Sequence, residues 1–264
     1  MSIIKNKEDL DNLRHSARIL GSVLYHVKNK AKAGVNAGDL NRFAIDFISK
    51  NDAKPAFLGL YGYPYALITE LNEIVIHGLS DDQNILPDKC VVSFDCGVVY
   101  KGMYSDACVL TTIGDVGDEV KMLVSKTEES LWAGIKAVKA GRRTGDIGFA
   151  VDNVLTKAGL GNITEFGGHG LGYKPHDDPF ILHRGAQGKG ERLFENMVIA
   201  IEPMTILGGD GRIKHIPIPG SQVTTAVSAN GKWGAHIEHT VLVTKNGYEV
   251  LTDISLEDII PIQK

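Results

Sequence analysis

The chain has 264 residues, of which 43% are hydrophobic, and carries 28 lysines and arginines against 32 aspartates and glutamates. This composition is typical of a globular protein with a substantial core, and the formal charge of −4 argues against a specific nucleic-acid partner. No apolar run reaches the roughly 18–20 residues of a membrane span, and the first residues lack a signal-peptide hydrophobic region. The three cysteines form no CxxC pair, which disfavours a disulfide scaffold and indicates a reducing, cytoplasmic setting.

A nine-residue repeat relates the two halves of the chain. Residues 32–40 (KAGVNAGDL) and 139–147 (KAGRRTGDI) lie 107 positions apart. Each copy lies between two stretches with apolar residues at helical spacing, and strand-like segments follow. The expected helices span residues 8–30, 40–50, 118–140 and 147–157. We therefore expect one domain over 1–264 with pseudo-two-fold halves, 8–115 and 116–264, each with helices on an antiparallel sheet. A chance match over nine residues is the alternative.

Residues 91–110 (VVSFDCGVVYKGMYSDACVL) alternate in polarity around a central Lys101-Gly102, which predicts a β-hairpin. If Asp95 pairs directly with Asp106, both carboxylates lie on one face with Cβ atoms about 4.5–5.5 Å apart. Opposed like charges destabilise a sheet unless a proton or a cation lies between them. Each aspartate alone is more readily a solvent-facing residue, but the pair at one place indicates a metal site.

Three further residues extend this candidate site. His169 lies in GGHGLG, where the glycines leave the imidazole unobstructed, although such a pattern alone is more typical of a turn. Glu202 and Glu238 lie in apolar, strand-like runs, where a carboxylate is costly to bury unless it is paired or coordinates a metal. Exposure on an edge strand is the alternative for each glutamate. The same hairpin register pairs Cys108 with Ser93 and places the thiol near these groups.

Two aspartates, one histidine and two glutamates are too many ligands for a tetrahedral structural zinc. They suit two divalent cations bridged by carboxylates, such as Mn, Fe, Co or Zn. Two-metal sites of this kind activate water for hydrolysis. The predicted ligands are Asp95, Asp106, His169, Glu202 and Glu238.

Taken in order, the segments FDCG, YSDA, GGHGLG, PHDDP, IEP and IEHT resemble the metal-binding signature of the type I methionine aminopeptidases. That family belongs to the pita-bread metallohydrolases, which include prolidase, X-Pro aminopeptidase and creatinase. The resemblance extends over nearly the whole chain and implies the α+β pita-bread fold with a central dinuclear metal site. In that site Asp95 would chelate one cation, Asp106 and Glu238 would bridge both, and His169 and Glu202 would complete the other shell.

The resemblance also implies an activity: removal of the N-terminal methionine from nascent proteins and peptides, with a small second residue preferred. A metal-bridging hydroxide would attack the first peptide bond, with Glu202 as general base and then acid. His176 would stabilise the oxyanion and His77 would contact the scissile amide near its nitrogen. The candidates for the methionine pocket are Phe57, Leu60, Tyr63, Ile68 and His77. Phe57, Leu60 and Ile68 stand where bacterial members often have Cys or Tyr, so the pocket departs from the family pattern.

Two alternative functions are compatible with the same fold. A proline-specific peptidase or creatinase-like amidohydrolase normally carries an extra N-terminal domain, for which the first expected helix leaves no room. A non-catalytic binding module usually loses metal ligands, whereas all five are present here. We expect a cytoplasmic monomer whose partners are peptide N-termini, with the ribosome as a further candidate and without membrane or specific nucleic-acid binding.

Overall fold

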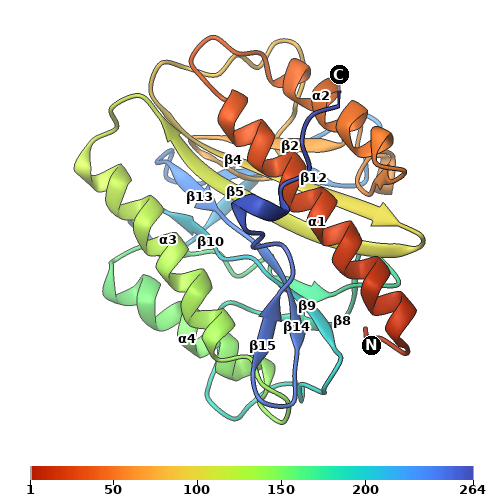
Figure 1. Ribbon diagram of the computed structural model, residues 1–264. Coiled ribbons are helices and arrows are strands. Elements are labelled where there is room, and N and C mark those ends of the chain that lie inside the picture. Colours follow the sequence, from red (N-terminus) through yellow and green to blue (C-terminus); the bar gives the residue numbers. More distant parts are fainter. Residues whose placement is uncertain (1, 264) are drawn as a thin grey trace.

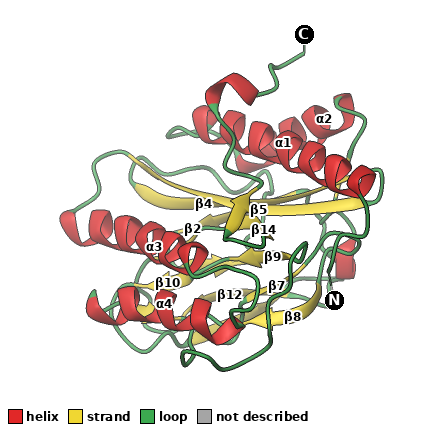
Figure 2. Cartoon of the chain, turned by 60° about the horizontal axis from the view of Figure 1, so that its bottom comes forward, coloured by secondary structure: helices red, strands yellow, loops and turns green. Residues whose placement is uncertain are grey.

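The computed structural model describes residues 2–263 as an α+β protein whose helices cover antiparallel sheets (Figure 1). Helix α1 (Lys7–Lys30) packs with α2 (Ala37–Lys50), and α3 (Asp118–Lys136) packs with α4 (Thr144–Lys157). Helix α2 spans residues 37 to 50 and α4 spans 144 to 157, which reproduces the spacing of the sequence repeat. The expected helix pairs on antiparallel sheets are confirmed (Figure 2).

The first helix shows how the local sequence sets these elements. The side chain of Asn6 accepts a hydrogen bond from the main-chain N–H of Asp9 at 2.9 Å and so caps the start of α1. The C-terminal part of the apolar stripe of this helix packs against α2 and β4 in one core cluster, and its N-terminal part packs in a second cluster. The stripe residues predicted from helical spacing, all buried in the structure, are Leu13, Ala17, Leu20, Leu24 and Val27.

The sheets lie behind the helices, and the longest strands form the predicted hairpin. Strands β4 (Cys90–Tyr100) and β5 (Met103–Ile113) pair along their whole length, and β1 (Lys54–Pro55) and β2 (Leu67–Leu71) pair with β4. A five-stranded sheet has the order β15-β14-β9-β7-β8, and two three-stranded sheets have the orders β13-β10-β6 and β11-β12-β3. Their strands are β3 (Ile74–Ile76), β6 (Gly161–Asn162), β7 (Gly168–Gly170), β8 (Asp177–Ile181), β9 (Val198–Ile201), β10 (Met204–Ile206), β11 (Ile213–Pro217), β12 (Thr224–Ser228), β13 (Gly234–His236), β14 (His239–Val243) and β15 (Tyr248–Val250). Short 3₁₀ helices span Leu60–Gly62 and Leu256–Asp258.

The hairpin exists, but its register differs from the predicted one. Lys101 and Gly102 form a two-residue turn with φ angles of 46° and 81°, as a type I′ turn requires. Asp95 therefore pairs with Cys108, and the predicted direct pairing of Asp95 with Asp106 is wrong. The offset is two residues along the strand, so the side chains of Asp95, Asp106 and Cys108 still lie on one face.

The predicted pairing of Cys108 with Ser93 is wrong for the same reason, since Ser93 pairs with Leu110. Cys108 nevertheless lies on the face that carries the two aspartates, as expected. Its side chain is fully buried.

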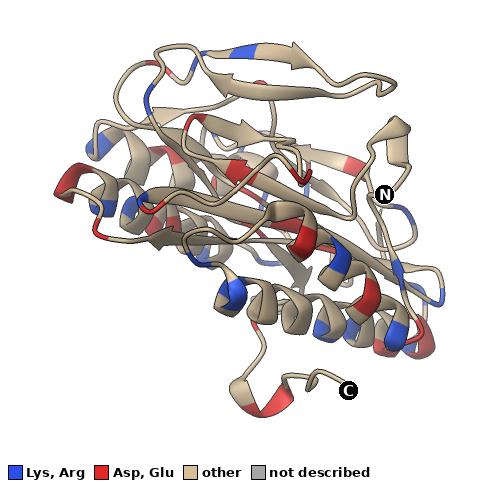
Figure 3. Cartoon of the chain, turned by 90° about the horizontal axis from the view of Figure 1, so that it is seen from above, with Lys and Arg blue, Asp and Glu red and all other residues tan. Residues whose placement is uncertain are grey.

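Basic and acidic residues are interspersed along the helices (Figure 3). The ion pair between Arg14 and Glu249, at 2.7 Å, is about two-fifths exposed on each side, so it contributes little to stability. Among residues 2–263, no helix combines the length and apolar composition that a bilayer crossing requires.

Candidate metal centre and substrate pocket

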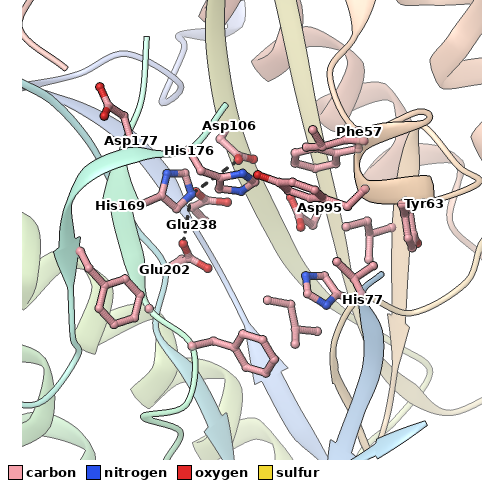
Figure 4. A pocket seen from close by; sticks show the side chains of 18 of the residues that line it. Phe57, Tyr63, His77, Asp95, Asp106, His169, His176, Asp177, Glu202 and Glu238 are labelled. Carbon is pink, nitrogen blue, oxygen red and sulfur yellow. Dashed lines mark ion pairs between the residues drawn. The ribbon is translucent and has the colours of Figure 1, made fainter. Parts of the chain in front are cut away.

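The predicted metal ligands line one pocket of about 590 Å³ that both halves of the chain contribute to (Figure 4). Asp95 and Asp106 project from the β4–β5 hairpin, and His169 projects from β7. Glu202 and Glu238 lie at breaks between strands. The structure therefore brings together five residues that lie far apart in the sequence.

The positions of the two glutamates follow from one crossover between sheets. Strands β9 and β14 pair within the five-stranded sheet, while β10 and β13 pair within a three-stranded sheet. Pro203 follows Glu202 at the break between β9 and β10, and Ile237 and Glu238 form the facing break between β13 and β14. Because both segments of the chain pass from one sheet to the other here, both carboxylates lie at the same junction.

His169 lies between strands that leave no room for side chains beside it. A Cβ atom on Gly168 would lie 2.2 Å from the carbonyl oxygen of Ala200, and one on Gly170 would lie 2.2 Å from that of Asp178. Any residue other than glycine at these two positions would force the strands apart. The glycines of GGHGLG therefore serve close strand packing around the imidazole.

The His169 imidazole is oriented so that a neutral ring could bind a cation. Its Nδ1 donates to the carbonyl oxygen of Gly170 at 3.0 Å, so the lone pair is on Nε2. That atom lies 3.5 Å from Glu202 Oε1 and 3.9 Å from Asp106 Oδ2 (Figure 4). Burial lowers the pKa of His169 to about 3, with the nearby His176 as a smaller cause.

The carboxylates form two overlapping groups of ligand atoms. One oxygen each of Asp95, Asp106 and Glu238 lie within 4.8 Å of one another, and ligand atoms of His169, Glu202 and Glu238 do the same. Burial raises the pKa of Asp106 to about 7, and burial with neighbouring carboxylates raises those of Asp95, Glu202 and Glu238. Such crowding of acids is unfavourable without protons or cations to balance it.

This donor set fits divalent cations. Within the described residues, Asp95 Oδ1, Asp106 Oδ1 and Glu238 Oε1 are buried without any hydrogen-bond partner. Buried carboxylate oxygens normally have a hydrogen-bond partner, so we expect these three to contact a bound cation. Four carboxylates and one imidazole are ligands of borderline to hard cations.

Two further predicted residues, His77 and His176, also line the pocket. His77 has a φ of 57°, a left-handed conformation that non-glycine residues seldom adopt outside functional or turn positions. Its Nδ1 donates to the carbonyl oxygen of Thr224 at 3.0 Å, and burial lowers its pKa to about 4. The His176 ring centroid lies 4.5 Å from that of His169. The ring of Tyr61 stacks on His176 at a centroid distance of 6.1 Å.

Four of the five predicted methionine-pocket residues, all except His77, form an apolar wall beside the predicted metal ligands (Figure 4). Phe57, Tyr63 and Ile68 belong to one buried cluster, with Leu60 packed against it. The Tyr63 hydroxyl donates to the carbonyl oxygen of Gly78, so the ring is held in place.

Sequence reasoning missed several residues of this pocket. Most of them adjoin segments that the motifs had already marked, and that adjacency was the available signal. The additional lining residues are Tyr61, Ile76, Glu165, Phe166, Gly167, Asp177, Asp178, Phe180 and Val223. Val223 has no motif beside it and enters the pocket only through the tertiary fold.

Several known proteins are similar to this chain over nearly its whole length. Residues 11–245 match the model of metallopeptidase family M24. The chain is 38% identical to a methionine aminopeptidase of Clostridium perfringens over 96% of its own length and 99% of the relative. It is 33% identical to methionine aminopeptidase 1 of Bacillus subtilis, over 96% of its length and 100% of the relative.

Solved structures agree with these sequence matches. A crystal structure of a methionine aminopeptidase from Thermotoga maritima superposes with a TM-score of 0.91 at 35% identity, covering 96% of this chain and all of that one. A prolidase from Pyrococcus furiosus superposes with a TM-score of 0.77 at 22% identity, covering 96% of this chain and 66% of that one. The second likeness concerns the fold alone. The predicted pita-bread fold is confirmed by both.

Proposed function

The chain belongs to metallopeptidase family M24, and we propose that its pocket removes methionine from the N-termini of peptides and nascent proteins in a metal-dependent hydrolysis. The observation that carries this proposal is the convergence of Asp95, Asp106, His169, Glu202 and Glu238 beside an apolar wall. The relatives named methionine aminopeptidase match the chain over nearly its whole length.

We propose that two divalent cations, drawn from Co, Mn, Fe and Zn, bind this donor set. Two overlapping groups of ligand atoms share Glu238, and Asp106 lies between them, so these two carboxylates would bridge the cations. Asp95 would complete one shell, and His169 with Glu202 would complete the other. When bound, the cations activate water as a nucleophile and polarise the carbonyl group of the scissile bond.

Glu202 would carry the proton during hydrolysis. Its side chain is buried, and burial together with the charges of Asp106 and Asp95 raises its pKa. That shift belongs to the metal-free protein; in the cation-loaded site, a carboxylate beside the attacking water can accept its proton and then return it to the departing amine. General acid–base catalysis of this kind contributes about 10²–10⁴ to the rate.

His77 would accept a hydrogen bond from the substrate. Because its Nδ1 hydrogen points to Thr224 and its pKa is lowered to about 4, Nε2 carries a lone pair at neutral pH. That lone pair can accept the N–H of the scissile amide and so orient the bond. His176 would stabilise the oxyanion, a role whose loss typically costs about 10²–10³ in rate.

The side chain of the first residue would lie against Phe57, Leu60, Tyr63 and Ile68. Methionine suits such a wall because its unbranched thioether adapts to irregular apolar space and contacts aromatic rings favourably. The wall is formed on one flank of the metal ligands, so the first peptide bond of a bound chain would lie beside Glu202.

We also propose that the protein works as a monomer in the cytoplasm on chains that emerge from the ribosome. Residues of both proposed halves, 8–115 and 116–264, line the pocket and include the candidate ligands. The cysteines are free and buried, which suits a reducing compartment.

The function is tested by comparing Met-Ala-Ser with N-acetyl-Met-Ala-Ser, Leu-Ala-Ser and Ala-Pro-Ser in the metal-loaded protein. We expect release of methionine from the first peptide alone at a high rate. Faster cleavage of Ala-Pro-Ser would assign the chain to the proline-specific branch of the fold. Absence of cleavage with metal bound would indicate a binding module.

A further inference from the structure

A second buried polar cluster lies behind the candidate metal centre. It consists of Glu70 on β2, Cys108 on β5 and His236 on β13, which are 2%, 0% and 1% exposed. One ligand-type atom from each of them lies within 4.8 Å of the others. No step of the proposed reaction uses these residues.

The sheet register places this cluster directly beside the metal ligands. Glu70 pairs with Ser93, two residues before Asp95, and Asp95 pairs with Cys108. Since alternate residues of a strand share a face, Glu70 and Cys108 point to the same side as Asp95. The cluster is therefore continuous with the site.

His236 is fixed on three sides by this face of the sheet. Its main-chain N–H donates to Ser93 Oγ at 3.2 Å, and its carbonyl oxygen accepts from Cys108 Sγ at 3.5 Å. Its ring Nδ1 lies 3.2 and 3.1 Å from the two carboxylate oxygens of Glu70. Rotation of the imidazole would break the contact with Glu70, so the ring has one favoured orientation.

The fixed ring presents its other nitrogen to Glu202. His236 Nε2 is buried without a hydrogen-bond partner within the described residues and lies 3.8 Å from Glu202 Oε2. The other oxygen of Glu202, Oε1, lies 3.5 Å from His169 Nε2. The main-chain N–H of Glu202 donates to Nε2 of the buried His183 at 3.1 Å.

We propose that Glu70 and His236 are positioning residues that hold the Glu202 carboxylate in its working orientation toward the metal centre. This inference rests on the proposed function of Glu202. Asp95, Asp106 and Glu238 all repel an ionised Glu202, and a carboxylate surrounded by like charges turns away unless a partner holds it. His236 is that partner when its single ring proton is on Nε2: the buried Glu70, whose pKa burial raises, keeps its own proton, donates it to Nδ1 and fixes the ring.

The same three side chains could instead bind a third cation, since they offer a thiol, an imidazole and a carboxylate. The contacts favour positioning, because Glu70 already occupies His236 Nδ1 and the Cys108 thiol already donates to a carbonyl oxygen. The two assignments differ in metal stoichiometry, which can be measured.

The test uses the full-length protein, stripped of metal and titrated with Co(II), with visible absorption, binding affinity and steady-state kinetics as readouts. The disruptive variants are His236→Phe, Glu70→Leu and the double variant. Glu70→Gln is the conservative variant, because its amide N–H can donate to Nδ1 as the protonated carboxyl does. His239→Gln is the matched control, since that imidazole lies outside the cluster and contacts Thr252 Oγ1 at 2.8 Å and the ring of Trp132.

We expect each disruptive single variant to lower kcat and the Co(II) affinity by about 10–100-fold and to alter the Co(II) spectrum, as loss of groups that orient metal ligands does. KM should change little, and Glu70→Gln should restore most of the loss. The double variant should be no worse than His236→Phe, because Glu70 acts through His236. His239→Gln should retain the wild-type values.

Three results would overturn the inference: wild-type kcat and Co(II) affinity in Glu70→Leu, additive losses in the double variant, or a third Co(II) equivalent that Cys108→Ala removes. A variant that fails to fold is identified by its circular dichroism and replaced by Glu70→Gln and His236→Gln, for which the Co(II) affinity decides. If the wild type binds Co(II) but releases no methionine, the proposed function fails, while the affinity comparison still decides the positioning role.

Discussion

The main chains of Glu238 and Cys108 pair with each other: the Glu238 N–H donates to the Cys108 carbonyl at 3.0 Å, and the Cys108 N–H donates to that of Glu238 at 3.3 Å. This bridge ties the break between β13 and β14 to the hairpin strand that carries Asp106. Backbone hydrogen bonds thus hold the two proposed bridging carboxylates near each other across the halves of the chain. The fold maintains the repulsion between these carboxylates, and the proposed cations would relieve it.

The role of Glu202 is tested by Glu202→Gln. The amide has nearly the same shape but cannot accept the proton from water, so we expect kcat to fall by about 10²–10⁴-fold. Circular dichroism and the thermal midpoint should stay close to wild type when metal is present. A variant that retained wild-type kcat would remove Glu202 from proton transfer.

The buried acids predict a pH dependence of stability in the metal-free protein. Asp106 has a pKa raised to about 7 in the folded state, against an ordinary value of 3.8. Between these values the folded chain holds a proton that the unfolded chain has released, so the unfolding free energy falls as pH rises, by up to about 1.4 kcal/mol per pH unit. Below pH 4 and above pH 7 this contribution is constant.

This dependence is isolated by comparing wild type with Asp106→Asn. The buried histidines, whose folded pKa values are lowered, titrate in both proteins and cancel in the difference. Asp95, Glu202 and Glu238 add to the difference in the same direction, because the charge of Asp106 contributes to their raised pKa values. In EDTA, with urea as denaturant, we expect the unfolding free energy of the wild type to fall relative to that of Asp106→Asn between pH 4 and 7. Saturating Mn(II) should abolish the shift, because a cation binds the ionised form. A pH-independent difference in EDTA would contradict the raised pKa.

The apolar wall predicts the selectivity for the first residue. Phe57 is buried and packs with Tyr63 and Ile68, so Phe57→Ala opens space beside the bound side chain. We expect kcat/KM for a Met-Ala-Ser peptide to fall by roughly 10-fold or more and the preference for methionine over leucine to shrink. Phe149→Ala removes an exposed ring of α4 and serves as the control. An unchanged preference in Phe57→Ala would exclude Phe57 from the pocket.

The cysteines should resist thiol reagents in the folded protein. Cys90, Cys96 and Cys108 are fully buried, and burial raises the pKa of the Cys90 thiol to about 11 and raises the pKa values of the other two well above their usual range. Little thiolate exists at neutral pH, and it is the thiolate that reacts. We expect a colorimetric disulfide reagent to label no cysteine at pH 8 and three after denaturation. Rapid labelling of Cys108 with loss of activity would instead indicate access through the metal pocket.

The sequence predicted the fold and the residues of the site well where the signal was local or repeated. Helical spacing identified the buried stripe of α1, and the repeat identified α2 and α4 as equivalent. The five candidate ligands and both histidines were predicted from motifs, and the structure places all of them along one pocket. Their roles as ligands and catalytic groups stay predictions.

The hairpin register could not be obtained from the same pattern. Registers that differ by two residues place the same side chains on each face, so alternation cannot distinguish them. The register is set by the two-residue turn, and this turn was hard to predict because its Lys101 adopts a φ of 46°, which lysine rarely does. The Glu70–His236 contact was missed because its partners belong to different sheets and neither lies in a recognisable metal motif.

Metal-dependent release of methionine by this site is tested by titrating metal-free protein with Mn(II) or Co(II) while measuring methionine release from a Met-Ala-Ser peptide. The proposed dinuclear site predicts no release without metal, a rise in activity as metal is added and saturation by two equivalents, with Glu202→Ala inactive throughout. Release at full rate in EDTA would contradict the metal requirement, and release at full rate in the Glu202→Ala variant would contradict the role of Glu202.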